Sequence, residues 1–123
     1  MWRASVLHII NLLKIKIMAS FIELPKNVTG SSFDLLNVSN PVREITSPSS
    51  TTLKISFFNL NDDGDNEPSA TITVDSTMDA APRNTMINNL WAAVEKTTSQ
   101  PNSVPTLTMV GSVLVDSLLI THA

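Results

Sequence analysis

Residues 51–60 read TTLKISFFNL and residues 69–75 read SATITVD, and these two runs decide the fold. In the first run Leu53, Ile55 and Phe57 alternate with polar residues, and the second run alternates in the same way. A two-residue period of this kind is typical of strands with one buried face. Because the runs are similar in length and a polar segment joins them, they predict an antiparallel hairpin.

A helix is predicted directly after this hairpin. Its apolar residues recur at helical spacing, at Met86, Ile87, Leu90, Trp91 and Val94. They predict one helix face that packs on the sheet, with the tryptophan in the core. Pro82 is tolerated only in a first turn, so the helix is expected to begin at Asp79 or Ala80. Ser76 or Thr77 can supply the capping side chain.

Shorter β-type runs surround this unit, at residues 21–24, 33–38, 42–46, 106–110 and 113–121, with a loop at 47–50. The last run is apolar on both faces, which predicts either a central strand or a strand buried against another subunit. The strands are not interleaved regularly with helices, so the order is α+β. We expect one α+β domain over residues 18–123, either sandwich-like or a small antiparallel sheet with one packed helix.

Residues 1–17, MWRASVLHIINLLKIKI, differ from the rest because they are apolar and basic with no acidic residue. Lys14 and Lys16 interrupt the apolar run expected of a signal peptide. A transmembrane helix needs about 20 apolar residues, more than this segment offers. An amphipathic surface helix is a third alternative. The fourth is that the protein starts at Met18, which would make residues 1–17 a non-native or flexible extension.

The composition argues against several function classes. The formal net charge is −3 and the basic residues are scattered, so neither a nucleic-acid partner nor a membrane partner is expected. There is no cysteine, which excludes disulfides and thiolate chemistry, and there are only two histidines, His8 and His122. The three glycines do not form a phosphate-binding loop, and no G-x-S-x-G motif occurs. We therefore expect no enzyme activity, no catalytic residues and no cofactor.

The acidic segment between the two hairpin strands raises the question of calcium. Oxygen-bearing residues fall in an EF-hand register at Asn59, Asn61, Asp63 and Asp65. Position 12 of that register is Ala70, where a bidentate glutamate is needed, so an EF-hand is not expected. A solvated loop is the first interpretation. A ligand or Ca²⁺ site of another kind in residues 61–67 is the alternative.

The chain resembles the small uncharacterised virion-associated proteins of marine tailed bacteriophages. The resemblance covers most of residues 18–123 and is carried by MASFIELP at 18–25, SSTTLKI at 49–55, ATITV at 70–74 and the single helix. It implies a place in the virion and contact with other virion proteins, without catalytic residues. The long acidic loop departs from the layout of that group.

These observations lead to one functional prediction and one interface prediction. The expected function is that of a non-enzymatic phage structural protein, such as a capsid decoration protein, that also contacts copies of itself. Low charge and an apolar last strand favour such contacts. The residues expected at the interface are Phe21, Ile22, Leu24, Phe58, Val113, Val115, Leu118 and Ile120.

Overall fold

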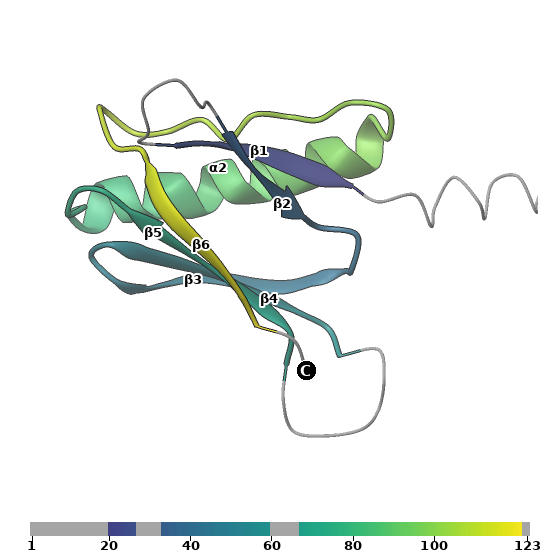
Figure 1. Ribbon diagram of the computed structural model, residues 1–123, viewed down its shortest axis with the longest axis horizontal. Helices are drawn as coiled ribbons and strands as arrows, with labels where there is room; N and C mark the ends of the chain where they lie inside the picture. Colours follow the sequence, from purple (N-terminus) through teal and green to yellow (C-terminus); the bar gives the residue numbers. More distant parts are fainter. Residues whose placement is uncertain (1–19, 27–32, 60–66, 122–123) are drawn as a thin grey trace, which may run out of the picture.

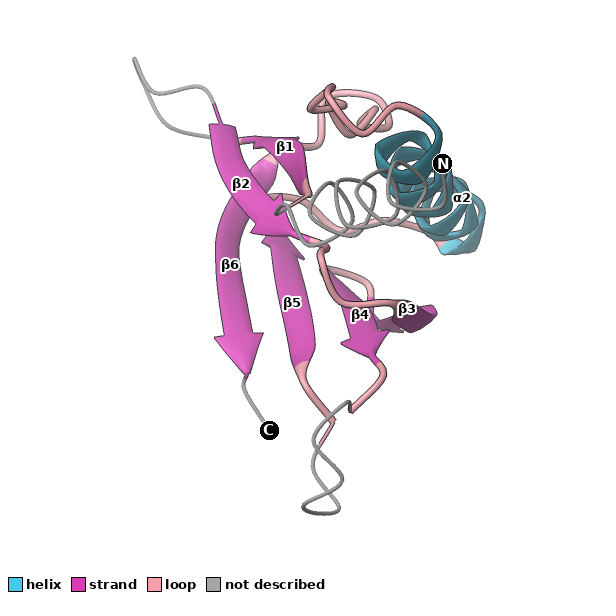
Figure 2. Cartoon of the chain, turned by 90° about the vertical axis from the view of Figure 1, so that its right-hand side faces the viewer, coloured by secondary structure: helices cyan, strands magenta, loops and turns pink. Residues whose placement is uncertain are grey.

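The computed structural model describes residues 20–26, 33–59 and 67–121. Its elements are β1 (Phe21–Pro25), β2 (Phe33–Asn37), β3 (Val42–Ser49), β4 (Thr52–Phe57), β5 (Ser69–Val74), α2 (Ala80–Ser99) and β6 (Val115–Thr121). The strands form a two-stranded sheet, β1-β2, and a four-stranded sheet in the order β3-β4-β5-β6. Helix α2 and the β1-β2 hairpin lie on the same side of the larger sheet (Figure 1, Figure 2). The predicted α+β class is confirmed.

The central hairpin is the one that the alternating sequence predicts. Strands β4 and β5 pair antiparallel, with Leu53 opposite Ile72 and Ile55 opposite Ala70. All four side chains are fully buried, because they lie on the sheet face that the helix and the small hairpin cover. Period-2 alternation therefore located both strands and their buried face correctly.

Helix α2 begins at Ala80, as expected, but its cap differs from the prediction. The N-cap residue is Asp79, whose side chain makes no capping hydrogen bond, so neither Ser76 nor Thr77 caps the helix. The buried line runs through Met86, Leu90, Ala93 and Thr97. The other predicted stripe residues flank this line and pack against the core while partly exposed: Ile87, Trp91 and Val94.

The segment after the helix is not a strand, contrary to the prediction for residues 106–110. It follows the free edge of β1, where Glu23 N–H donates to the Pro105 carbonyl and Leu107 N–H donates to the Glu23 carbonyl, both at 2.9 Å. The Asn89 side chain on α2 then donates to the Thr108 carbonyl at 2.9 Å. The contact with β1 is a single bridge, at Thr106, because the next backbone donor of β1 in this register would be residue 25, a proline without an N–H.

Both edges of the larger sheet differ from expectation. Strand β3 continues through Pro48 to Ser49, so the loop predicted at residues 47–50 is wrong except for its last residue. Strand β6 is an edge strand that pairs with β5, so the predicted central position is also wrong. Its start is held by a parallel bridge between Val115 and Lys26. The alternative, burial of β6 against another subunit, stays a prediction.

Candidate interaction surface

The residues predicted to form an interface fall into three groups in the structure. Ile22, Leu24 and Val115 are fully buried in the core and offer no side-chain surface to a partner. This corrects the interface prediction for these three residues. Their side chains face the interior, where they join one core cluster with residues of β4, β5 and α2 and are removed from water.

The other five predicted residues keep some exposed surface. Phe21, Val113 and Leu118 are half-buried, and the last two also pack against the core. Phe58 and Ile120 are 48% and 43% exposed. Phe58 follows the end of β4 on the side opposite the buried Phe57. Among the predicted residues, these two present the most apolar surface to solvent.

The structure adds apolar surface that the sequence interpretation missed. Leu119 on β6 is 63% exposed, and Phe33 and Leu35 on β2 are 45% and 56% exposed. The pairing of Ile22 with Leu36 turns Leu36 inward, and alternation then places Phe33 and Leu35 on the outer face of the small hairpin. The sequence of residues 33–36, Phe-Asp-Leu-Leu, already indicated apolar residues on both faces of this strand. Only the pairing with β1 shows which leucine is buried.

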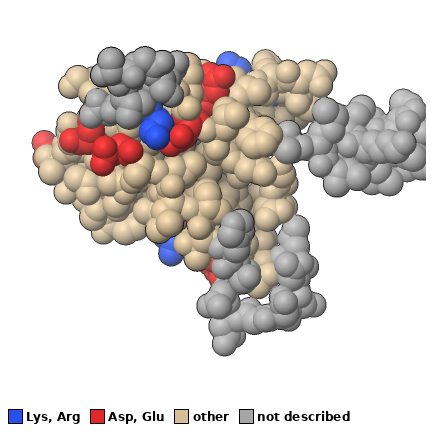
Figure 3. Space-filling model, in the orientation of Figure 1, with Lys and Arg blue, Asp and Glu red and all other residues tan. Residues whose placement is uncertain are grey.

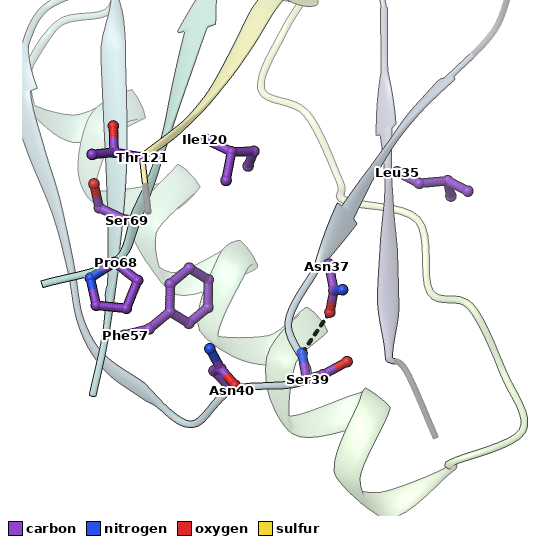
Figure 4. Close-up of a pocket in the computed structure, with 9 residues that line it drawn as sticks. All are labelled: Leu35, Asn37, Ser39, Asn40, Phe57, Pro68, Ser69, Ile120 and Thr121. Carbon is purple, nitrogen blue, oxygen red and sulfur yellow. Dashed lines mark hydrogen bonds between the residues drawn. The ribbon is translucent and has the colours of Figure 1, made fainter. Parts of the chain in front are cut away.

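Strands β2 and β6 approach each other around a cavity of about 350 Å³ (Figure 4). The cavity is lined by Leu35, Asn37, Ser39, Asn40, Phe57, Pro68, Ser69, Ile120 and Thr121. All of these side chains are uncharged. The Asn37 carboxamide oxygen accepts a hydrogen bond from the Ser39 N–H at 2.9 Å, which fixes the turn after β2. Such a lining offers apolar contact and neutral hydrogen bonds, without a nucleophile paired to a base.

The face of the four-stranded sheet away from the helix is polar and carries little charge. One cross-strand row consists of Thr46, Lys54, Thr71 and Leu119. In Figure 3 most of the visible surface is likewise free of charged side chains. The described part of the chain has three ion pairs: Arg43 with Glu67 at 2.6 Å, Arg43 with Glu44 at 3.6 Å, and the partly buried pair of Lys26 with Asp34 at 3.3 Å. Such pairs contribute about 0–1 kcal/mol each, so they do not determine how this surface binds.

The calcium alternative falls mostly outside the described residues, because the loop is described only at Glu67. That carboxylate is engaged by Arg43. In residues 20–26, 33–59 and 67–121, no group of three or more His, Cys, Asp or Glu side chains could hold a metal ion. The calcium hypothesis therefore stays a prediction. The predictions for residues 1–17 also lie outside the described part of the chain.

No helix in the part of the chain that the structure describes is long and apolar enough to cross a membrane. No model of a known protein family matches the chain, and neither curated proteins nor solved structures match it.

Proposed function

We propose that this protein is a non-enzymatic structural component of a bacteriophage virion, such as a capsid decoration protein, that acts through protein–protein contacts. The observation that supports this proposal is the exposure of Leu35 on β2 and Ile120 on β6, two apolar side chains that line one cavity. Exposed apolar surface of this kind marks contact sites in soluble proteins. The resemblance of residues 18–123 to phage virion proteins supplies the biological setting.

The surface suits a lattice component in two ways. Among the described residues, no strand pairs with the outer edge of β6 along residues 117–121, and these five residues carry no charge, so a neighbouring strand meets no repulsion there. The polar outer face of the sheet stays compatible with solvent wherever it is not covered. A small domain with one strand edge that can pair and one polar face that stays in solvent is suited to binding on the surface of a larger shell.

The test is the composition of purified particles. Virions isolated by density gradient are expected to contain this chain at a fixed ratio to the major capsid protein in every preparation, as measured by quantitative mass spectrometry. A phage protein made early in infection and absent from particles serves as the control. Detection in infected cells but not in gradient-purified particles would overturn the proposal.

A second candidate function is the binding of a small ligand or Ca²⁺. The cavity between β2 and β6 is within the size range of small-molecule sites and is lined by neutral polar and apolar groups. This observation favours an uncharged ligand there, while the acidic residues 61–67 remain the candidate for a cation. Calcium titration followed by thermal unfolding tests the loop, and an unchanged midpoint would contradict cation binding.

A further inference from the structure

We infer that the open edge of β6 pairs with the β6 edge of a second copy of this chain, so that two four-stranded sheets join into one continuous antiparallel sheet. This inference rests on the proposed structural role and names the partner for part of its contact surface.

The outer edge of β6 offers backbone hydrogen-bonding groups. In the described part of the chain, β6 is the last strand of its sheet, and its outer edge meets another segment only at Val115, through the bridge to Lys26. Residues 117–121 therefore present an unpaired row of backbone groups. A strand edge of this kind is a template for pairing with another chain.

The side chains along this edge are complementary to themselves. In an antiparallel pair centred on Leu119, each leucine lies opposite its own copy, Leu118 lies opposite Ile120, and Ser117 lies opposite Thr121. Apolar residues thus meet apolar residues on both faces, and small hydroxyl residues meet each other. A two-fold interface requires self-complementarity of this type. The large exposure of Leu119 and Ile120 is then explained, because both become covered.

The charges beside the edge support a second copy over an oppositely charged partner. From Ser117 to Thr121 there is no charge for a basic or acidic segment to recognise. The nearest charged residue is Asp116. In a register centred on Leu119, the two copies of Asp116 lie on opposite sides of the two-fold axis and are kept apart. The basic residues 1–17 would gain only this one carboxylate on β6, so they are the weaker candidate occupant.

The experiment uses the full chain and two variants at one position. Sedimentation velocity is measured up to about 1 mM protein, because a contact this short is expected to be weak. The native chain is expected to dimerise. Leu119→Lys and Leu119→Glu, measured separately, should each raise the dimer dissociation constant at least about tenfold, since like charges then face each other. A 1:1 mixture of the two variants should recover the dimer, because residue 119 contacts its own copy.

Thr71→Lys is the matched control. Thr71 is the neighbour of Leu119 on β5 and lies on the same sheet face, one strand away from the edge. This variant adds the same charge and should leave dimerisation unchanged. Circular dichroism melts of all variants establish that they fold, which is expected because Leu119 is mostly exposed.

Three results would overturn the inference. They are a native chain that stays monomeric over the whole concentration range, a dimer that Leu119→Lys does not weaken, and single variants whose mixture stays monomeric. A monomeric chain that is nevertheless present in purified virions would remove the strand pairing and leave the proposed virion role standing.

Discussion

The two edge strands of the larger sheet, β3 and β6, are built in opposite ways. Strand β3 contains Pro48, and its pairing with β4 shifts register twice, between Val42 and Glu44 and between Thr46 and Ser49. Helix α2 also packs against it. Strand β6 contains no proline, and its one register shift with β5 lies near its start. One edge is therefore blocked and bent, while the other is straight enough to accept a neighbour.

The two edge strands differ in the features that protect a strand edge from pairing with another chain. Proline, irregular pairing and a covering helix are the means by which proteins prevent edge strands from pairing with other chains. Here they are concentrated on β3, where Arg83 on α2 also donates from Nε to the Ser47 hydroxyl at 2.9 Å and from Nη2 to the Ser47 carbonyl at 2.7 Å. Strand β6 lacks these features, and this is consistent with a role of its edge in pairing with another chain.

The largest expected effect is on the free energy of unfolding, when a buried side chain of α2 and an exposed side chain of β6 are each truncated to alanine. Leu90→Ala removes a fully buried side chain from the helix that covers β3 and should lower the free energy of unfolding by about 2–5 kcal/mol. Ile120→Ala on β6 truncates a side chain that is 43% exposed and should cost about 1 kcal/mol or less. Urea unfolding of dilute protein measures both values. Equal losses would contradict the distinction between a packed side and an open side.

Much of the fold was predictable from the sequence because its signals are local. The alternation of residues 51–60 and 69–75 fixes which side chains share a face whatever the strands pair with. Pro82 similarly fixes the start of α2, since it fits only the first turn. The exact buried line was missed because Ala93 and Thr97 form its C-terminal half, and neither is a large apolar residue.

The candidate surface was less predictable because it depends on strand order. A run such as residues 113–121, apolar on both faces, has the same pattern in a central strand as in an edge strand that awaits a partner. Only the pairing of β6 with β5 on one side shows that it lies at the edge. The same reason explains why three predicted interface residues, Ile22, Leu24 and Val115, lie in the core. A short apolar strand does not reveal which of its faces another layer covers.

A smaller effect is expected at the link between α2 and β3. Arg83→Ala removes both hydrogen bonds to Ser47 and should lower the free energy of unfolding by about 1–2 kcal/mol, because they tie the helix to the blocked edge. Arg83→Lys keeps the charge but cannot reproduce the two-pronged geometry, so it should recover only part of this loss. Chemical denaturation of the two variants beside the native chain gives the comparison. Full recovery by lysine would mean that charge alone, and not the paired geometry, stabilises this contact.

The smallest effect should come from Pro48→Val, which restores a backbone donor and a strand-favouring side chain to β3. We expect a stability change within about 0.5 kcal/mol. The informative readout is association, measured by sedimentation in the Leu119→Lys background so that the β6 edge does not contribute. Only slight self-association should appear, because the register shifts and α2 still obstruct this edge. Strong association would show that Pro48 alone blocks β3, and the protection of that edge would then depend on one residue.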